Sequence, residues 1–306
     1  MRFSIWPSPA QSWESIYDIV SHCERTGWDG VYFADHFMPN APDSQQPLDG
    51  DMLECWSVIA ALAATVPRVR LAPLVTSVTY RHPAVLANIA AAVDQISHGR
   101  LTLGVGAGWQ LNEHAVYGIP LGSIRERMDR FAEAVEVLRA LLSQQRTTFS
   151  GEYFELQDAP CQPGPVQDRM PLLIGGGGER RTLRIAAKYA DEWNAWTTPE
   201  LLAHKLSVLR AHCEEIGRDA GQIHVSTQAR LLLSTDKRWL DEKRQSATPG
   251  GPPVIIGTPA EVVEILARYQ EAGADELIVP DASLGSGERK KDTCDLFMSE
   301  VAPSFR

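Results

Sequence analysis

The first candidate for chemistry is the segment Asp35-His36-Phe37, which directly follows the apolar run Val31–Ala34. A histidine with an ordinary pKa of ~6.5 can give or take a proton near neutral pH, so His36 is a candidate acid or base. Asp35 could fix the tautomer of the imidazole or meet a polar edge of a cofactor. Because neighbouring residues of a strand point to opposite faces, one of the two must lie in a loop. A packed polar pair without chemistry is the alternative interpretation.

A second candidate segment has glycines at alternate positions after the apolar run Leu101–Val105. It comprises Gly106, Ala107, Gly108, Trp109, Asn112 and Glu113. Glycines remove side chains from a strand end, which lets a planar ligand lie against the backbone. Trp109 could stack on such a ligand or close a substrate pocket, or it could pack beneath a loop. Glu113 is a second candidate acid or base.

Four consecutive glycines, Gly175–Gly178, follow the short apolar run Leu172–Ile174 and precede a helix start with Arg180 and Arg181. Successive backbone N–H groups and a helix N-terminus together favour an anion, and arginine can add a bidentate phosphate contact. The alternative is a flexible turn. A plain turn does not require four glycines, however, and glycine carries a conformational entropy cost on folding.

Small hydroxyl side chains, Thr76 and Ser77, follow the apolar run Val69–Val75. They could let the backbone approach a flat ring, although ordinary loop polarity is the commoner explanation. The sequence contains no nucleophile elbow, no P-loop and no metal-ligand spacing, so we expect no metal site. A phosphate-binding segment beside a glycine-lined strand end instead indicates a phosphorylated planar cofactor.

The bulk composition restricts partners and location. The formal net charge is −10 and basic residues do not cluster, which argues against a nucleic acid partner. No apolar stretch approaches the ~18 residues of a membrane span, and the first residues lack the pattern of a signal peptide. Five widely spaced cysteines indicate reduced, mostly buried thiols. We expect a cytoplasmic protein that acts on a small molecule and binds no membrane.

Apolar runs of strand length alternate with amphipathic runs of helix length along the whole chain. The expected strands are Arg2–Trp6, Val31–Ala34, Val69–Val75, Leu101–Val105, Leu172–Ile174, Trp193–Trp196, Ile223–Leu233 and Glu276–Val279. The expected helices begin near Ser12, Leu53, Pro83, Ser123, Glu179, Pro199, Pro259 and Lys290. Eight such units predict an α/β fold, a (β/α)8 TIM-type barrel, whose catalytic groups gather at the strand ends. A doubly wound open sheet is the alternative, but no G-x-G-x-x-G follows the first strand.

Two segments interrupt this alternation. Gln144–Met170 is rich in proline and glycine, and Ser234–Pro253 is polar. Segments of this length without a strand or helix pattern are usually lids or locally disordered loops. We therefore expect one domain, residues 1–306, with insertion loops at 144–170, after the fourth helix, and at 234–253, before the seventh.

Several motifs together resemble the bacterial luciferase-like superfamily. They are Asp35-His36-Phe37, Tyr80-Arg81-His82-Pro83, Ser97-His98-Gly99-Arg100, Gly104–Trp109, Ile174–Gly178 and Ile256-Gly257-Thr258-Pro259. The match follows nearly the whole chain in order. Within the superfamily the chain is most similar to oxidoreductases that use 8-hydroxy-5-deazaflavin (coenzyme F420), while other members use FMN.

The resemblance implies a cofactor ring across the barrel mouth and a cofactor phosphate at Gly175–Gly178. Residues expected to contact the cofactor are Asp35, Thr76, Ser77, Val78, Gly106, Ala107, Gly108, Asn112, Arg180 and Arg181. It further implies a non-proline cis peptide after the third strand, here placed at Ser77-Val78, and association into a homodimer.

The resemblance also implies hydride transfer between F420 and a small organic substrate, with His36 first and Glu113 next as the proton-transfer group. Deazaflavin glucose-6-phosphate dehydrogenases have a glutamate where this chain has Trp109, which argues against a sugar substrate. One alternative is monooxygenation with FMN that a separate reductase supplies in reduced form, and another is a flavin-binding barrel without turnover. A set of aromatic residues suggests an apolar or aromatic substrate pocket: Trp6, Phe37, Trp56, Trp109 and Trp196.

Overall fold

In the computed structural model of the protein, helices surround a parallel sheet. The structure describes residues 1–41, 43–246 and 250–306. Its strands are β1 (Arg2–Trp6), β2 (Gly30–Phe33), β3 (Arg70–Pro73), β4 (Thr76–Ser77), β5 (Leu103–Gly106), β8 (Leu172–Gly175), β9 (Glu192–Trp196), β10 (His224–Gln228) and β13 (Glu276–Pro280). In the described part of the chain these nine strands follow the order β3-β2-β1-β13-β10-β9-β8-β5-β4. A parallel bridge between Leu71 and Leu101 brings β3 beside the segment that leads into β5. The sheet is therefore a nearly closed, TIM-like barrel, as predicted.

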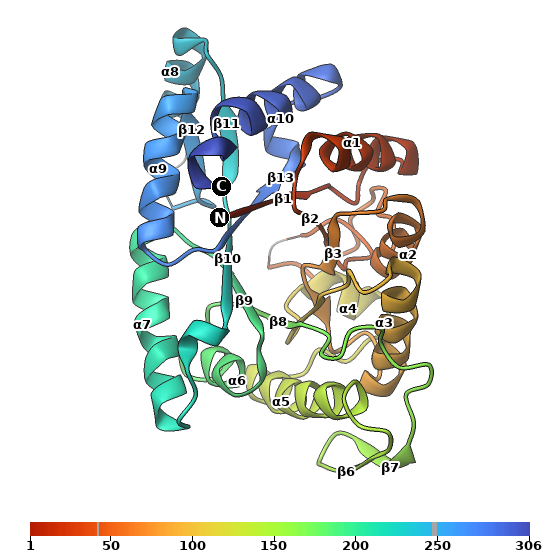
Figure 1. Cartoon of the computed structure of the whole chain (residues 1–306). Coiled ribbons are helices and arrows are strands. Elements are labelled where there is room, and N and C mark those ends of the chain that lie inside the picture. Colours follow the sequence, from red (N-terminus) through yellow and green to blue (C-terminus); the bar gives the residue numbers. More distant parts are fainter. Residues whose placement is uncertain (42, 247–249) are drawn as a thin grey trace.

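Helices form a ring around this barrel (Figure 1). They are α1 (Trp13–Thr26), α2 (Cys55–Thr65), α3 (Pro83–Ser97), α5 (Ile124–Leu141), α6 (Thr182–Tyr189), α7 (Pro199–Glu215), α9 (Pro259–Glu271) and α10 (Glu288–Glu300). Their starts are encoded locally: Ser123 and Thr258 each form a capping box with a glutamate three residues later. Proline occupies the first turn of α3, α7 and α9, where its missing N–H leaves no hydrogen bond unmade. In the described part of the chain, no helix combines the length and apolar character needed to cross a bilayer.

The two predicted insertions contain ordered elements. Residues 144–170 hold an antiparallel hairpin of β6 (Thr147–Ser150) and β7 (Glu155–Ala159). Residues 234–253 hold α8 (Lys237–Ser246), and residues 247–249 of this segment lie outside the described residues. β12 (Val254–Gly257) follows directly. The sequence pattern of these segments did not reveal their secondary structure.

The expected seventh strand, Ile223–Leu233, is wrong as a single element. The chain forms β10 up to Gln228, and then β11 (Arg230–Leu233) in a separate two-stranded sheet with β12. β10 has both edges paired, with β9 and with β13. β11 leaves the barrel and pairs with a segment that the sequence pattern did not mark as a strand. A continuous apolar run cannot show such a change of partner.

The third strand is also shorter than expected. β3 pairs with β2 and ends at Pro73, whereas β4 pairs with β5 on the other side. Between them lies a cis peptide bond at Leu74-Val75, so its placement at Ser77-Val78 is wrong. The bond does follow the third strand, but this strand ends two residues earlier than the expected Val75. A short helix, α4 (Leu111–Val116), follows β5 and was not expected.

Close backbone contact between strands fixes the barrel below the site. A Cβ atom on Gly104 would lie 2.1 Å from the carbonyl oxygen of Pro73, which real Cβ contacts do not allow. Gly104→Ala must therefore separate β5 from β3, and we expect it to lower the free energy of unfolding by about 1–3 kcal/mol. Urea unfolding followed by circular dichroism measures this change.

Gly164→Ala is the matched control, because its nearest neighbour, the carbonyl oxygen of Cys161, would be 3.7 Å from the new Cβ. Its stability should stay close to that of the wild-type protein. Equal stability of the two variants would contradict the proposed close contact.

Candidate active site

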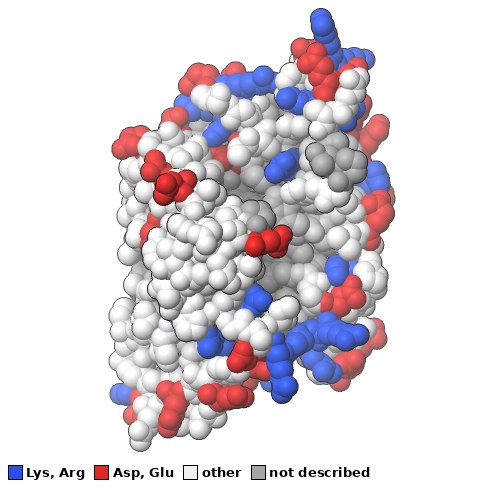
Figure 2. Space-filling view, turned by 180° about the vertical axis from the view of Figure 1, so that it is seen from behind, with Lys and Arg blue, Asp and Glu red and all other residues white. Residues whose placement is uncertain are grey.

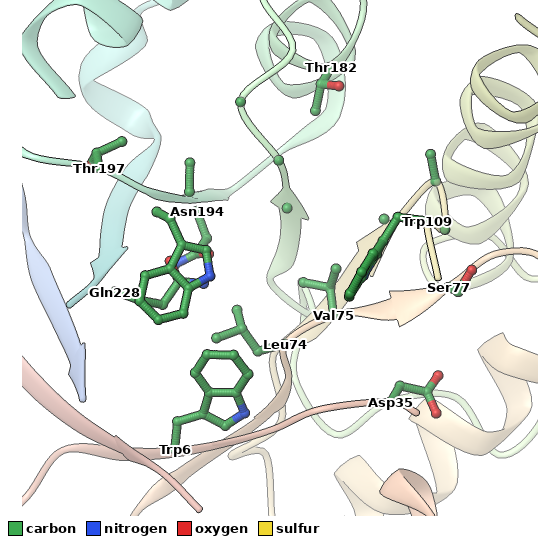
Figure 3. Close-up of a pocket in the computed structure, with 18 of the residues that line it drawn as sticks. Trp6, Asp35, Leu74, Val75, Ser77, Trp109, Thr182, Asn194, Thr197 and Gln228 are labelled. Carbon is green, nitrogen blue, oxygen red and sulfur yellow. The ribbon is translucent and has the colours of Figure 1, made fainter. Parts of the chain in front are cut away.

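A cavity of about 680 Å³ opens at the carboxyl ends of the barrel strands. Trp6, Gly106, Gly175 and Gln228 contribute to its wall, and each is the last residue of its strand. Figure 3 shows side chains from several strands and loops directed toward this space. The surface seen from behind Figure 1 is hollowed near its centre, and the walls of the hollow are largely uncharged (Figure 2). The strand ends thus hold the candidate site, as is general for barrels of this type.

The wall contains much of the site predicted from sequence: Asp35, His36, Ser77, Gly106, Ala107, Gly108, Trp109, Gly175, Gly176 and Gly177. Among the aromatic candidates, Trp6, Trp109 and Trp196 also line it, whereas Phe37 and Trp56 do not. β2 ends at Phe33, so both Asp35 and His36 lie in the loop that follows. Their side chains can therefore reach the same cavity.

His36 is held by a buried carboxylate. Its Nδ1 lies 2.7 Å from Oε1 of Glu113, whose side chain is fully buried. Glu113 also accepts a hydrogen bond of 2.8 Å from the backbone N–H of Phe37 and one from the hydroxyl of Tyr80. Burial alone would raise the pKa of Glu113, but the hydrogen bonds from His36, Phe37 and Tyr80 hold it below the ordinary value. The ionised carboxylate is thus the acceptor.

This arrangement assigns different tasks to the two candidate acid–base residues. Because the ionised Glu113 accepts from Nδ1–H, the Nε2 atom of His36 is the ring nitrogen left for other partners. His36 contributes to the cavity wall and Glu113 does not. Trp109 lies edge-on to the imidazole with ring centroids 5.4 Å apart, and it is 56% exposed. Glu113 therefore orients His36 and does not itself face the cavity.

Asp35 belongs to a separate ion-pair network. Its oxygens lie 2.6 and 3.2 Å from the guanidinium of Arg81, which also contacts Glu54 at 2.6 Å. Burial raises the pKa of Asp35, while the Arg81 charge and hydrogen bonds oppose this effect. Asp35 reaches the cavity wall, but both of its oxygens already have a partner.

The side chain of Val75 leaves no room for other side chains at the glycines that end β5 and β8. A Cβ on Gly106 would lie 2.7 Å from Cγ2 of Val75, and one on Gly175 would lie 2.9 Å from both Val75 methyl groups. The side chain of Val75 thus occupies the space in which other residues would place theirs. This packing leaves a flat stretch of backbone along the cavity wall, which suits a planar ligand.

The glycine segment after β8, here called the cradle, has features that favour an anion. Gly176 has φ +115°, a conformation that side chains disfavour, and the N–H groups of Gly177 and Gly178 have no hydrogen-bond partner among the described residues. α6 begins just beyond, at Thr182. Lys205 of α7 lines the same cavity and donates to Glu179 over 2.6 Å. The cradle therefore combines free backbone donors, a helix N-terminus and a cation.

Other predicted site residues lie behind or outside the cavity wall. Thr76 is buried and accepts from the indole N–H of Trp56 at 2.9 Å. Asn112 is buried too and donates to the carbonyl of Pro39 at 2.9 Å. These two side chains support the loops around the cavity.

Val78, Gly178, Arg180 and Arg181 likewise do not contribute to the wall. Val78 is buried and donates its N–H to the carbonyl of Gly106 at 3.1 Å. Arg181 is ion-paired with Asp129 of α5, and Arg180 is exposed. The cation that lines the cavity beside the cradle is therefore a lysine of α7 and not one of the two arginines.

Sequence reasoning missed several wall residues, among them Asn194, Gln228 and Lys205. Asn194 and Gln228 lie on β9 and β10, where alternate residues point into the barrel, so strand alternation could have indicated them. Gln228 is 5% exposed and its Oε1 has no hydrogen-bond partner among the described residues. Lys205 lies in mid-helix, and no local signal distinguishes it.

Metal ligands and reactive thiols do not add to this site. Among the described residues, no group of three or more His, Cys, Asp or Glu side chains is arranged to hold a metal ion. All five cysteines are buried, as predicted.

The chain belongs to the luciferase-like monooxygenase family, whose model matches residues 1–249. An F420-dependent glucose-6-phosphate dehydrogenase of Kineococcus radiotolerans is 33% identical over 225 residues, which is 72% of this chain and 64% of that protein. The match thus covers slightly less than two thirds of that relative.

Solved structures of the same architecture include proteins with different cofactors. An F420-dependent secondary alcohol dehydrogenase with an F420–acetone adduct has a TM-score of 0.84 at 21% identity, covering 100% of this chain and 99% of the other. A riboflavin lyase with modified FMN and riboflavin has a TM-score of 0.81 at 17% identity, covering 99% and 90%. At such low identity both establish the fold alone.

The buried Glu113 carboxylate makes stability depend on pH. Because its pKa in the folded protein lies below the ordinary 4.5, its contribution is present above pH 4.5 and is lost as the pH falls through the lowered value. Glu113→Gln should lower the free energy of unfolding by about 1–3 kcal/mol at pH 7, and this deficit should shrink in acid. Urea unfolding at a series of pH values measures it.

Glu242→Gln serves as the control, since this side chain is 66% exposed on α8. It should change stability little at any pH. A Glu113→Gln deficit that is constant or grows as the pH falls would show that the carboxylate is not ionised in the folded protein.

Proposed function

We propose that this protein transfers a hydride between coenzyme F420 and a small organic substrate. The observation that carries the proposal is the pair of His36 and Glu113, which presents a single oriented imidazole nitrogen to a large cavity beside an anion-binding cradle. Oxidation of an alcohol, or reduction of a carbonyl or C=C bond, by hydride transfer also moves a proton. An oriented histidine is suited to that task.

The residues present fit a phosphorylated planar cofactor. Gly177, Gly178 and Lys205 would hold its phosphate, because the two backbone donors are free and Lys205, which is paired with Glu179, lines the same cavity. The backbone at Gly106 and Gly175 would lie against its ring, since Val75 excludes side chains there. The deazaflavin supplies a ring carbon that accepts or releases a hydride and does not activate oxygen. A methyl group at position Gly177 would fit in the structure, because its nearest neighbour, Cε of Lys205, would be 3.7 Å away.

The protein's own contribution is the proton at Nε2 of His36. A substrate hydroxyl would give its proton to a neutral Nε2, and a substrate oxygen would take one from a protonated Nε2. Glu113 keeps the ring in the tautomer that leaves Nε2 free and stabilises positive charge on the ring. Trp109, edge-on to His36, would restrict water at the reacting atoms.

Support for F420 comes from relatives, and FMN is the second candidate. The glucose-6-phosphate dehydrogenase is F420-dependent by name, whereas the lyase structure holds FMN. Reduced FMN from a separate reductase would support monooxygenation, the activity in the family's description. Oxygen consumption during turnover separates the two, because only the flavin reacts productively with oxygen.

Titration of purified apoprotein with F420 and with FMN, followed by cofactor fluorescence, tests the cofactor. We expect tight binding of F420, and binding about tenfold or more weaker for Gly177→Ala and for Lys205→Gln, which fill the cradle or remove its charge. Lys188→Gln, at a lysine 61% exposed on α6, should bind like the wild-type protein. Tight FMN binding without any response to F420 would overturn the proposal.

His36→Asn tests the proton-transfer role. With an alcohol or carbonyl compound on which the wild-type protein acts, turnover should fall about 10²–10⁴-fold, since general acid–base help is worth that much. The dissociation constant for the cofactor should stay within about twofold, with His22→Asn on α1 as a control for both quantities. If cofactor affinity collapses while turnover at saturating cofactor is normal, His36 is a binding residue.

A further inference from the structure

A second cavity of about 980 Å³ adjoins the first. Trp6 and Trp196 contribute to the walls of both, and their ring centroids are 5.8 Å apart. Figure 3 shows Trp6 on the side of the first cavity opposite Thr182, which marks the start of α6. The two spaces are therefore neighbours with a common indole boundary.

The chain itself connects the two cavities. Gln228, at the end of β10, lines the first, and Arg230, at the start of β11, lines the second. Two residues of extended chain span only ~7 Å, so a group at Gln228 is a short distance from the second cavity. The unpaired, buried Oε1 of Gln228 calls for a donor such as a hydroxyl or N–H of a ligand. A ligand donor at this carbonyl oxygen would lie at the boundary between the two cavities.

The second cavity is positively charged. Arg230, Lys243 and Arg289 contribute to its wall, and the described residues that line it include no Asp or Glu. Lys243 of α8 and Arg289 of α10 approach the indole of Trp239, with 5.5 and 4.7 Å from the charged group to the ring centroid. No carboxylate of the described residues lies within 4.0 Å of these three cations. In a chain of formal net charge −10, three such cations around one cavity favour an anionic ligand.

The remaining wall is largely apolar. Leu232, Val254, Ile256 and Leu284 line the cavity, and Val254 is 39% exposed although it belongs to β12. An inorganic anion would use the cations but would leave these side chains in contact with water. A ligand with an apolar body and a charged end satisfies both parts of the wall.

We propose that the second cavity binds the distal, anionic end of an elongated substrate whose reacting end lies beside His36. The class is an amphipathic organic anion, with a carboxylate, sulfonate or phosphate at the end remote from the reacting carbon. The assignment of the reacting end rests on the proposed function, whereas binding of the anionic end does not.

The position of the cradle separates this site from the cofactor phosphate. The cradle follows β8, whereas the second cavity lies over β13 and the β11–β12 pair. In the sheet, β9 and β10 lie between β8 and β13. A cofactor whose phosphate is held at the cradle would therefore not place that phosphate in the second cavity.

Decanoate is the probe, with decanol as a neutral ligand of equal chain length. Quenching of tryptophan fluorescence reports binding, since Trp6, Trp196 and Trp239 line the cavity. We expect the wild-type protein, both as apoprotein and loaded with cofactor, to bind decanoate more tightly than decanol and to lose this preference at high salt. Arg230→Gln/Arg289→Gln should weaken decanoate binding about tenfold and leave decanol unaffected.

Arg238→Gln is the matched control, because Arg238 lies on α8 with a side chain 92% exposed and does not contribute to the cavity wall. It should bind decanoate like the wild-type protein. Equal binding of decanol and decanoate, no binding of either, or the same loss in Arg238→Gln would overturn the proposal.

Cofactor binding by the double variant distinguishes a substrate site from a site for the cofactor tail. Unchanged F420 affinity with weakened decanoate binding supports a substrate site. If the double variant loses affinity for F420 but retains it for the 8-hydroxy-5-deazaflavin riboside, which lacks the phosphate and tail, the cavity holds the cofactor tail and the substrate assignment is wrong. Failure of wild-type protein to bind F420 would refute the proposed function alone, since decanoate binding is measured independently on the apoprotein.

Discussion

The candidate site depends on one buried carboxylate. Glu113, on the short helix after β5, accepts hydrogen bonds from the imidazole of His36, the backbone N–H of Phe37 and the hydroxyl of Tyr80. A buried carboxylate is costly unless its oxygens are satisfied, so these three donors must be in place together. The interaction thereby ties the loop after β2 and the loop after β4 to the segment after β5. It fixes the position of the imidazole that faces the cavity.

The other buried charges around the cavity are also satisfied by partners. Asp35 and Glu54 share Arg81, and Glu179 pairs with Lys205 next to the glycine cradle. Each buried or half-buried charge of these networks has a partner, which leaves the wall itself largely uncharged. A ligand therefore meets apolar surface, free backbone donors and a few directed polar groups. This composition is typical of small-molecule and cofactor sites.

After β10 the chain leaves the barrel, and the elements that follow form part of the second cavity. β11 pairs with β12 and not with the barrel, and α8 packs on this pair. The elements contributed by this segment bring Arg230, Lys243 and Trp239 to a second cavity that shares Trp6 and Trp196 with the first. The segments that follow the barrel strands thus supply His36 and Glu113, while β11, β12 and α8 supply a neighbouring wall of different charge. In barrels of this type a rigid sheet commonly positions functional residues that lie on variable loops.

The sequence by itself determined the strand–helix alternation, the barrel-like parallel sheet, and the position of His36, Trp109 and the glycines at strand ends. Hydrophobic periodicity and glycine placement are local signals. It also singled out Glu113, although only tertiary structure decided that this residue holds His36 and does not face the cavity. Three further features likewise depend on contacts between segments far apart in the chain. They are the pairing of β11 with β12, the cis peptide at Leu74-Val75 and the position of Lys205 beside the cradle. No local pattern encodes such contacts, since each is set by the packing of the complete barrel.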